Sequence, residues 1–435
     1  MKDEPHGVPL DFTRNKPSEP LPDISALLIR TQEGNPKALL ANAITILRYH
    51  PQWENVLAFN EFSLYVATKK PATWQKQAGR NWTDYDDSMC ADWLQHESIL
   101  VTSRVAAEAV QTVARENAFH PVKDYLNGLK WDQKPRLDQW LTTYLGAEAS
   151  PFTSAVGARW LISAVARIFQ PGCQVDHTML LEGPQGIRKS TALRVLASDE
   201  WFADHISELG SKDSRIELHG KWILEMSEMD RVRRGELERV KAFLTARTDH
   251  FRVPYGRRAE DVPRTCVFAA SVNDETPLTD ETGNRRFWPV RCGSINIPAL
   301  TRDRDQLWAE AYKCYRDGVV WWLDSDELNK LAKAEQEERY DLDIWHETIM
   351  DWANDPKQRF EKDGASQLPI EPFLSVPGCV TVNDVLVHAI GRELERCTQT
   401  DKNRVARCLT HEGWKRQQGG TGDARGKWFY IRGAR

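Results

Sequence analysis

An apolar run, a glycine turn and the start of a helix follow one another in Met179-Leu180-Leu181-Glu182-Gly183-Pro184-Gln185-Gly186-Ile187-Arg188-Lys189-Ser190-Thr191. This order is typical of a phosphate-binding loop, in which backbone N–H groups surround a triphosphate and the helix N-terminus adds partial positive charge. In such a loop Lys189 would neutralise the outer phosphates, and the Ser190 hydroxyl would bind Mg²⁺. We therefore expect ATP and Mg²⁺ as cofactors, with the residues from Gly183 to Thr191 forming the nucleotide site.

One residue departs from the usual pattern of these loops. Glycine normally stands immediately before the lysine, where this chain has Arg188. We expect this position to lie in the first turn of the helix, where φ is negative and a side chain fits if it points away. The substitution is expected to alter affinity or turnover. An ordinary strand, turn and helix with a chance Lys-Ser pair is the alternative, because short motifs carry a false-positive risk.

Length and composition limit the other classes of function. With 435 residues, 41% of them hydrophobic, the chain is expected to form two or three globular domains. Its net charge of -5 excludes a uniformly basic nucleic-acid coat, so any DNA contact must come from local patches. The eight cysteines form no Cys-x-x-Cys pair and are expected to be free thiols in a reducing compartment. Since neither a signal peptide nor a membrane-spanning run is evident, we expect a cytoplasmic protein.

Strands alternate with helices from about residue 176 to 325, which is the pattern of a parallel sheet in an α/β fold. The regions on either side differ from this core in composition and periodicity. The expected organisation is a flexible leader at 1–35, an N-terminal α+β region at 36–120, a helical collar at 121–175, a P-loop ATPase core at 176–345, a linker at 346–379 and a winged-helix-like domain at 380–435.

Two glutamates lie near the end of the predicted strand from Trp222 to Ser227. Because ligands of open α/β sheets bind at the carboxyl ends of strands, Glu228 is the favoured residue to polarise the attacking water and to approach Mg²⁺. If the strand ends early, Glu225 binds the metal and Glu228 remains the base. The alternative is structural, with Glu225 paired to an arginine and Glu228 at a helix N-terminus.

Polar groups follow the later strand as well. Asn273 ends the apolar strand from Thr265 to Val272, where its amide could orient water or sense the γ-phosphate. Arg285 and Arg286, on a short loop after that strand, suit an arginine finger that stabilises charge developing on the γ-phosphate. A finger acting in trans would make the active unit a ring or another homo-oligomer. The alternatives are a turn-favouring asparagine and a solvated basic loop.

Two regions carry local positive charge. The segment from Arg247 to Arg264 holds five arginines against three acidic residues, with Tyr255 and Gly256 as the expected hairpin tip. Basic residues around an aromatic tip can follow a nucleic-acid backbone and stack a base, so the predicted DNA contacts are Arg252, Tyr255, Arg257 and Arg258. The tail from Gly391 has eleven Lys and Arg against five Asp and Glu, which suggests phosphate contacts. A mixed-charge surface hairpin and protein docking by the tail are the alternatives.

Taken in order, these motifs resemble those of the virulence-associated E family of prophages and other mobile elements, which is similar to superfamily 3 helicases and phage primase-helicases. The resemblance covers about residues 36 to 345 and rests on His120-Pro121-Val122-Lys123-Asp124-Tyr125-Leu126, Leu129-Lys130-Trp131-Asp132, Arg136-Leu137, Pro171-Gly172-Cys173, Gly183-Pro184-Gln185-Gly186, Lys241-Ala242-Phe243-Leu244, Pro254-Tyr255-Gly256-Arg257-Arg258 and Gly283-Asn284-Arg285-Arg286-Phe287-Trp288-Pro289-Val290. It implies an AAA+-like core, with a Walker A motif at Gly183 to Thr191, a Walker B motif ending at Glu228, a sensor at Asn273 and arginine fingers at Arg285 or Arg286.

The resemblance favours an ATP-dependent DNA helicase or remodelling ATPase in replication of a mobile element. The expected partners are single-stranded or forked DNA, further copies of this chain in a ring, and replication proteins of the element. A primase site is not expected, because Asp84, Asp86 and Asp87 lack flanking strands and are interpreted as a solvated loop. A nucleotide-switched DNA-binding or assembly factor with little unwinding is the alternative. A metabolic P-loop kinase is disfavoured, since it leaves the paired arginines without a use.

Overall fold

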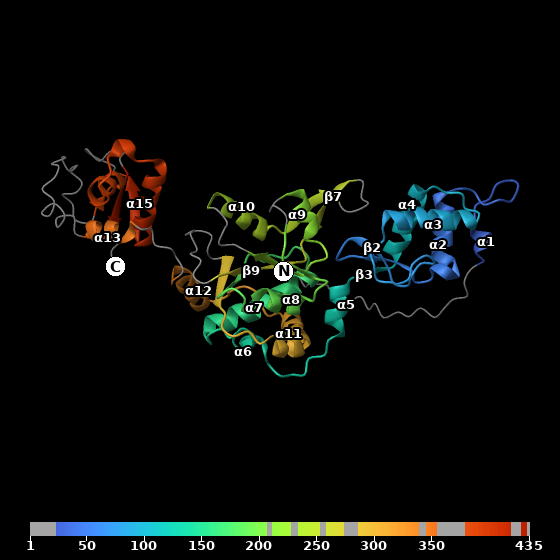
Figure 1. Cartoon of the computed structure of the whole chain (residues 1–435), viewed down its shortest axis with the longest axis horizontal. Coiled ribbons are helices and arrows are strands. Elements are labelled where there is room, and N and C mark those ends of the chain that lie inside the picture. Colours follow the sequence, from blue (N-terminus) through green and yellow to red (C-terminus); the bar gives the residue numbers. More distant parts are fainter. Residues whose placement is uncertain are drawn as a thin grey trace, which may run out of the picture. The chain divides into compact units, whose positions relative to one another are not determined.

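The computed structural model describes residues 23–206, 211–227, 234–252, 258–273, 286–338, 345–354, 379–418 and 428–432. The chain divides into two compact units. Figure 1 labels the helices and strands in chain order. The first comprises the chain up to Asn273 together with Val290–Leu328, and the second comprises the remainder. In the described part of the chain, none of the helices combines the length and the apolar character needed to cross a membrane.

The N-terminal part of the first unit is a small α+β region, as the sequence predicted. Its three-stranded sheet has the order β2-β1-β3. A shared hydrophobic core packs the sheet against the helices. The elements are α1 (Ile24–Leu27), α2 (Leu40–Tyr49), β1 (Leu57–Asn60), β2 (Tyr65–Thr68), α3 (Asp84–His96), α4 (Ser103–Glu116) and β3 (Ala118–Phe119).

The flexible leader was expected to extend to residue 35, but regular structure begins earlier than that. Residues 23–35 contain α1 and a β-bridge from Arg30 to Pro36. The buried Asn42 side chain fixes this segment, since it accepts from the Ile29 N–H at 2.9 Å and donates to the Ile29 carbonyl at 2.8 Å. Residues 1–22 lie outside the described part of the chain.

The expected solvated loop at Asp84, Asp86 and Asp87 is wrong, because these residues form the first turn of α3. Thr83 and Asp86 form a capping box, in which each side chain accepts from the other's backbone N–H. Asp86 is fully buried. Burial raises the pKa of Asp86, but hydrogen bonds from Arg80, Gln75 and Trp74 outweigh burial and hold that pKa below its usual value.

A five-stranded sheet has the order β10-β4-β9-β6-β5, and its strands β4, β9, β6 and β5 form the core of the first unit. Its strands are β4 (Thr178–Glu182), β5 (Phe202–Ala203), β6 (Ile223–Ser227), β9 (Val267–Val272) and β10 (Phe287–Arg291). β4, β9, β6 and β5 pair in parallel. Cys292, just past β10, donates its N–H to the Glu182 carbonyl at the end of β4, so β10 also finishes at this edge. The predicted α/β core with a parallel sheet is therefore present.

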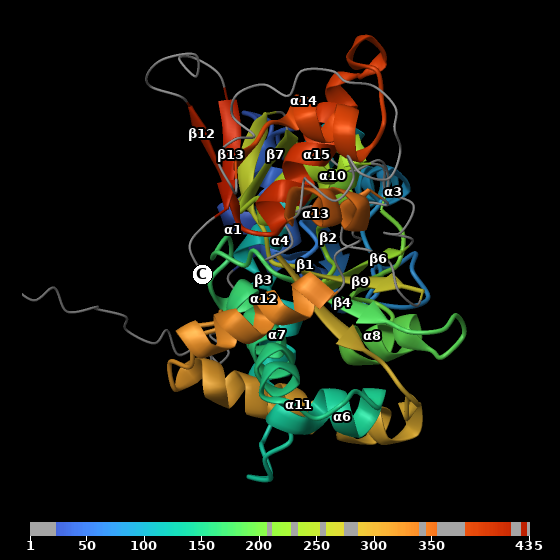
Figure 2. The ribbon, with the colours of Figure 1, turned by 90° about the vertical axis from the view of Figure 1, so that its left-hand side faces the viewer.

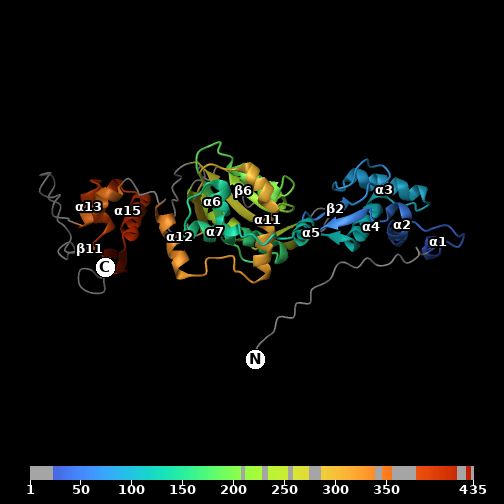
Figure 3. The same cartoon turned by 90° about the horizontal axis from the view of Figure 1, so that it is seen from below.

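Helices pack beside this sheet and fix its strands (Figure 3). The collar and core helices are α5 (Pro121–Gly128), α6 (Trp140–Leu145), α7 (Pro151–Phe169), α8 (Lys189–Ala197), α9 (Lys212–Glu217), α10 (Arg234–Thr245) and α11 (Ile297–Arg316). Trp222, immediately before β6, donates its indole N–H to the Ala164 carbonyl and stacks on Trp308 of α11 at 4.0 Å. These contacts position β6 and the carboxylate that it carries.

The second unit contains α12 (Asp326–Glu338, whose first residues belong to the first unit), α13 (His346–Asn354), β11 (Cys379–Val380), α14 (Val382–Asp384), a π-turn at Val385–Ala389, α15 (Gln399–His411), β12 (Trp414–Gln418) and β13 (Trp428–Arg432). β13 lies between β11 and β12, antiparallel to both, and Figure 2 shows β12 and β13 near α15. The linker expected at 346–379 starts too early, because α13 packs Ile349 and Trp352 into the core of this unit.

Candidate nucleotide-binding site

The predicted phosphate loop connects β4 to α8, as the sequence indicated. Gly183 has φ +144°, and a Cβ there would lie 2.8 Å from Ile187 Cδ1 and 3.0 Å from the Cys292 carbonyl oxygen. Gly186 also has a positive φ, of +86°. Only glycine takes both conformations without strain, so the turn needs its two glycines. The contact from Cys292 was not predicted, because it depends on the pairing of β10 with β4.

Arg188 was expected in the first turn of the helix, but the structure places it outside that turn. It is the N-cap of α8, with φ +77° and ψ 32°, in the left-handed region. A residue with a Cβ loses roughly 1–2 kcal/mol in this conformation, which explains why loops of this kind normally have glycine there. The helix begins at Lys189, so Arg188 lies before its first turn and is free of the helical φ that the expectation assumed.

The Lys189 side chain is folded over the loop. It is 8% exposed, and its ammonium donates to the carbonyls of Gly183 and, at 3.1 Å, of Pro184. A buried ammonium needs acceptors, and the carbonyls of the loop supply them here. The cation is therefore held at the turn where the sequence places the outer phosphates.

Ser190 at the start of α8 contacts Glu225 in the middle of β6. The Ser190 hydroxyl donates to Oε1 of Glu225 at 2.8 Å, and Glu225 is 1% exposed. Oε2 of the same carboxylate is buried and has no hydrogen-bond partner among the described residues. Burying a carboxylate oxygen without a partner is costly. A hydroxyl next to a half-satisfied carboxylate fits the oxygen ligands that Mg²⁺ prefers.

The strand register places Asn273 at the same edge. Glu182 pairs with Val272, so Asn273 leaves β9 where Gly183 leaves β4. Glu225 pairs with Ala269 on the same strand. The structure therefore brings Lys189, Ser190 and Asn273 to one edge of the sheet, and Glu225, in the middle of β6, is joined to this group by the hydrogen bond from Ser190.

Of the remaining catalytic residues predicted for this site, the structure describes only Arg286. Glu228 and Arg285 lie outside the described residues. Arg286 is half-buried and immediately precedes β10. Among the described residues no arginine pairs with Glu225, since Oε1 accepts from Ser190 and Oε2 has no hydrogen-bond partner.

Residues 126–341 match the family model of the virulence-associated protein E-like domain. This region is a virulence-associated protein E-like domain. Its match agrees with the family that the motifs indicated. No curated protein matches the chain significantly.

Solved structures with a similar fold come from NrS-1. The apo structure of the NrS-1 C-terminal region aligns with a TM-score of 0.50 and 12% identity, over 86% of this chain and 95% of that chain. An A-form apo structure of the same region gives a TM-score of 0.43 and 16% identity, over 71% and 78% of the two chains. At 12% identity the first of these likenesses concerns the fold alone.

Within the virulence-associated protein E-like domain, β7 (Thr248–Arg252) and β8 (Ala259–Pro263) form the predicted hairpin. Arg252 and Arg258 are exposed beside its tip, whereas Tyr255 and Arg257 lie outside the described residues. The structure thus presents two of the four predicted DNA contacts to solvent.

Arg264, which sequence analysis counted with the basic residues of this hairpin, is buried instead. Its guanidinium binds both carboxylate oxygens of Asp249, at 2.6 and 2.7 Å, and lies 4.5 Å from the centre of the Phe243 ring. A bidentate buried pair of this kind fixes both partners geometrically. Because β9 starts three residues later, Arg264 connects the base of the hairpin to the strand that ends at Asn273.

Proposed function

We propose that this chain is a Mg²⁺-dependent ATPase that remodels DNA, acting as a helicase in replication of a mobile element. The observation that carries the proposal is the Ser190–Glu225 pair, in which Oε2 of the carboxylate finds no partner among the described residues, next to Lys189 on a strand–loop–helix turn. The family match, together with the fold shared with the NrS-1 C-terminal region, supports the assignment to mobile-element replication.

Each residue at the sheet edge has a distinct proposed role. Ser190 and Glu225 would hold Mg²⁺, which supplies positive charge to the β- and γ-phosphates when bound. Lys189 would exchange its loop carbonyls for phosphate oxygens, since charge-assisted hydrogen bonds to an anion are stronger than those to neutral carbonyls. Asn273 would orient the attacking water, and Glu228, three residues after Glu225, would accept its proton.

An arginine at the start of β10 suggests catalysis between copies of the chain. β10 finishes at the edge where β4 finishes, whereas Arg286 stands before its first residue. A nucleotide bound at the carboxyl ends of the strands is far from a residue at the amino end of a strand in the same sheet, so such a residue would act on a different nucleotide. We therefore propose that Arg285 or Arg286 acts on ATP held by a second copy, in a homo-oligomeric ring.

DNA would be contacted by the exposed arginines of the hairpin. Arg252 and Arg258 flank the tip, and their guanidinium groups can bind successive phosphates of a single strand. The second unit, whose helices and antiparallel strands are compatible with a winged helix, would add contacts through its basic tail.

A nucleotide-switched assembly factor is the second candidate, and Arg188 favours it. The left-handed conformation of a non-glycine residue directly before Lys189 strains the loop that must close around ATP. Such a factor would bind ATP and assemble but separate no strands. An unwinding assay on forked duplex DNA distinguishes the two candidates.

The test of the proposed function is ATP hydrolysis with and without single-stranded DNA. We expect hydrolysis that DNA stimulates, and its loss to background in Lys189→Ala, because the phosphates then lack their cation. Lys130→Ala removes an exposed lysine of the same domain and serves as the matched control. Unchanged hydrolysis in a folded Lys189→Ala protein would refute the assignment.

A further inference from the structure

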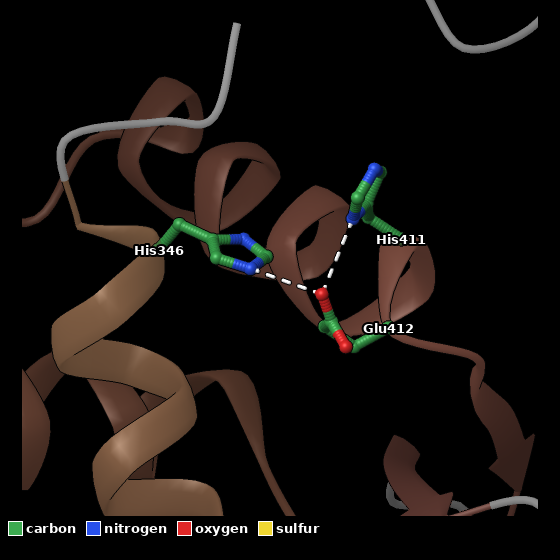
Figure 4. Close-up of side chains that lie close together, drawn as sticks. All are labelled: His346, His411 and Glu412. Atoms are coloured by element: carbon green, nitrogen blue, oxygen red, sulfur yellow. Dashed lines mark hydrogen bonds and ion pairs between the residues drawn. The ribbon is translucent and has the colours of Figure 1, made fainter. Parts of the chain in front are cut away.

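Two histidines and a glutamate converge in the second unit, outside the virulence-associated protein E-like domain (Figure 4). His346 is the first residue of α13, His411 is the last residue of α15, and Glu412 follows it. Their potential ligand atoms all lie within 4.8 Å of one another. Among the residues that the structure describes, this is the group of His, Cys, Asp and Glu whose ligand atoms lie close enough together to hold one metal ion.

The two distances from Glu412 to the histidines match those between ligands of a single small cation. Oε1 of Glu412 lies 3.1 Å from Nε2 of His346 and 3.5 Å from Nδ1 of His411. Zinc bonds of about 2.0–2.2 Å in a tetrahedron place neighbouring ligand atoms about 3.4 Å apart. The three atoms therefore need only small side-chain rotations to bind one ion.

The donor set indicates which metal would bind. Two imidazole nitrogens and one carboxylate suit Zn²⁺ or a similar transition metal, whereas Mg²⁺ and Ca²⁺ prefer oxygen ligands alone. The side chains of His346, His411 and Glu412 are 11%, 25% and 42% exposed. An ion could thus enter from solvent and keep a water molecule as its fourth ligand.

The surrounding contacts hold the group in place. The Trp345 ring, next to His346 in sequence, is covered by the guanidinium of Arg404 from α15 at 3.6 Å. The rings of His346 and His411 meet edge to face, with centroids 5.5 Å apart. These contacts pre-position both imidazoles, which reduces the entropy lost when a metal binds.

We propose that His346, His411 and Glu412 bind one Zn²⁺ ion that joins α13 to the turn between α15 and β12. These ligands are separated by as many as 66 residues along the chain, so the ion would stabilise the fold of the second unit by cross-linking it. The proposal is independent of the ATP site, because none of its ligands belongs to that site.

The test uses the 435-residue chain, freed of metal with a chelator and studied in excess Mg²⁺. Zinc titrated by calorimetry should bind with a stoichiometry of one per chain and raise the midpoint of thermal unfolding. Glu412→Gln keeps an acceptor oxygen for His346 but removes the ligand charge, so we expect its zinc affinity to fall about tenfold or more. His346→Gln and His411→Gln should lose the thermal shift, and His96→Gln, an exposed histidine elsewhere, should retain it.

Two outcomes would overturn this proposal. One is the absence of zinc binding by the folded wild-type chain, which would leave the group as an ordinary histidine–glutamate pair. The other is equal zinc binding by wild type and Glu412→Gln, which would assign the ion to a different site. Because Glu412 is partly exposed, Glu412→Gln is expected to fold even if a histidine variant does not.

Discussion

The N-terminal region and strand β6 each bury a carboxylate, and the two are surrounded very differently. Asp86 accepts hydrogen bonds at both oxygens, among them from Arg80 at 2.8 Å and Trp74 at 2.9 Å. Glu225 accepts from Ser190 at one oxygen, and its other oxygen is buried without a partner in the described part of the chain. A carboxylate that the protein satisfies completely holds structure together, whereas one left half-satisfied beside a phosphate loop is available to a ligand.

The largest expected effect comes from removing the charge of Glu225. Glu225→Gln should lower kcat for ATP hydrolysis by roughly 10²-fold or more, because the proposed metal ligand becomes a neutral amide. Thermal stability should stay constant or rise, since the variant no longer buries an unsatisfied charge. Steady-state hydrolysis and calorimetry on one preparation measure both quantities.

Glu310→Gln is the control for that variant. Glu310 is also a buried glutamate of the first unit, but its carboxylate accepts from the backbone N–H groups of Arg136 and Leu137. Its replacement should therefore leave kcat unchanged. If Glu225→Gln lost stability and kept its activity, Glu225 would have the structural role that we assign to Asp86, and the proposed metal ligand would be wrong.

Asp86→Asn should show the opposite pattern to Glu225→Gln. The amide cannot accept all the hydrogen bonds of the carboxylate and leaves Arg80 without its charge partner, so we expect a loss of about 2–4 kcal/mol in unfolding free energy. The ATPase rate per folded molecule should be unaffected. Urea unfolding followed by tryptophan fluorescence measures the loss, since four of the seventeen tryptophans lie in and around this core and contribute to the signal.

The same carboxylate gives a pH dependence with a defined sign. The pKa of Asp86 is lower in the folded protein than in the unfolded chain. Its contribution to stability is therefore complete above the unfolded pKa, near 4, and is lost as the pH falls through the lower folded value. Wild type should lose stability below about pH 4 more steeply than Asp86→Asn, and parallel acid-unfolding curves would contradict this.

Much of the core could be predicted from the sequence because its signals are local. The loop motif and the apolar run before it correctly predicted where β4 ends and α8 begins. The polar residues at the strand ends indicated a ligand site at the carboxyl edge of the sheet. The missed features depend on contacts between distant residues. The partners of Asp86 come from a neighbouring loop, and Arg264 is buried by Asp249 and Phe243 although its local composition is that of a basic surface.

The conformation of Arg188 leads to the smallest predicted effect. Arg188→Gly removes a left-handed strain of about 1–2 kcal/mol, but glycine also gains roughly 0.5–1 kcal/mol of entropy in the unfolded chain. The net stabilisation should therefore be about 0.5–1 kcal/mol. ATP turnover should rise several-fold, since the loop could then close around the nucleotide without strain, whereas affinity for ATP should change little.

Arg188→Ala separates backbone strain from charge. Alanine removes the guanidinium but has a Cβ, so it keeps the penalty of φ +77° and should gain no stability. If both variants raise turnover equally, the arginine side chain and not the backbone limits the wild-type rate. If neither does, the loop tolerates this departure, and the strain at Arg188 no longer favours a nucleotide-switched factor over a motor.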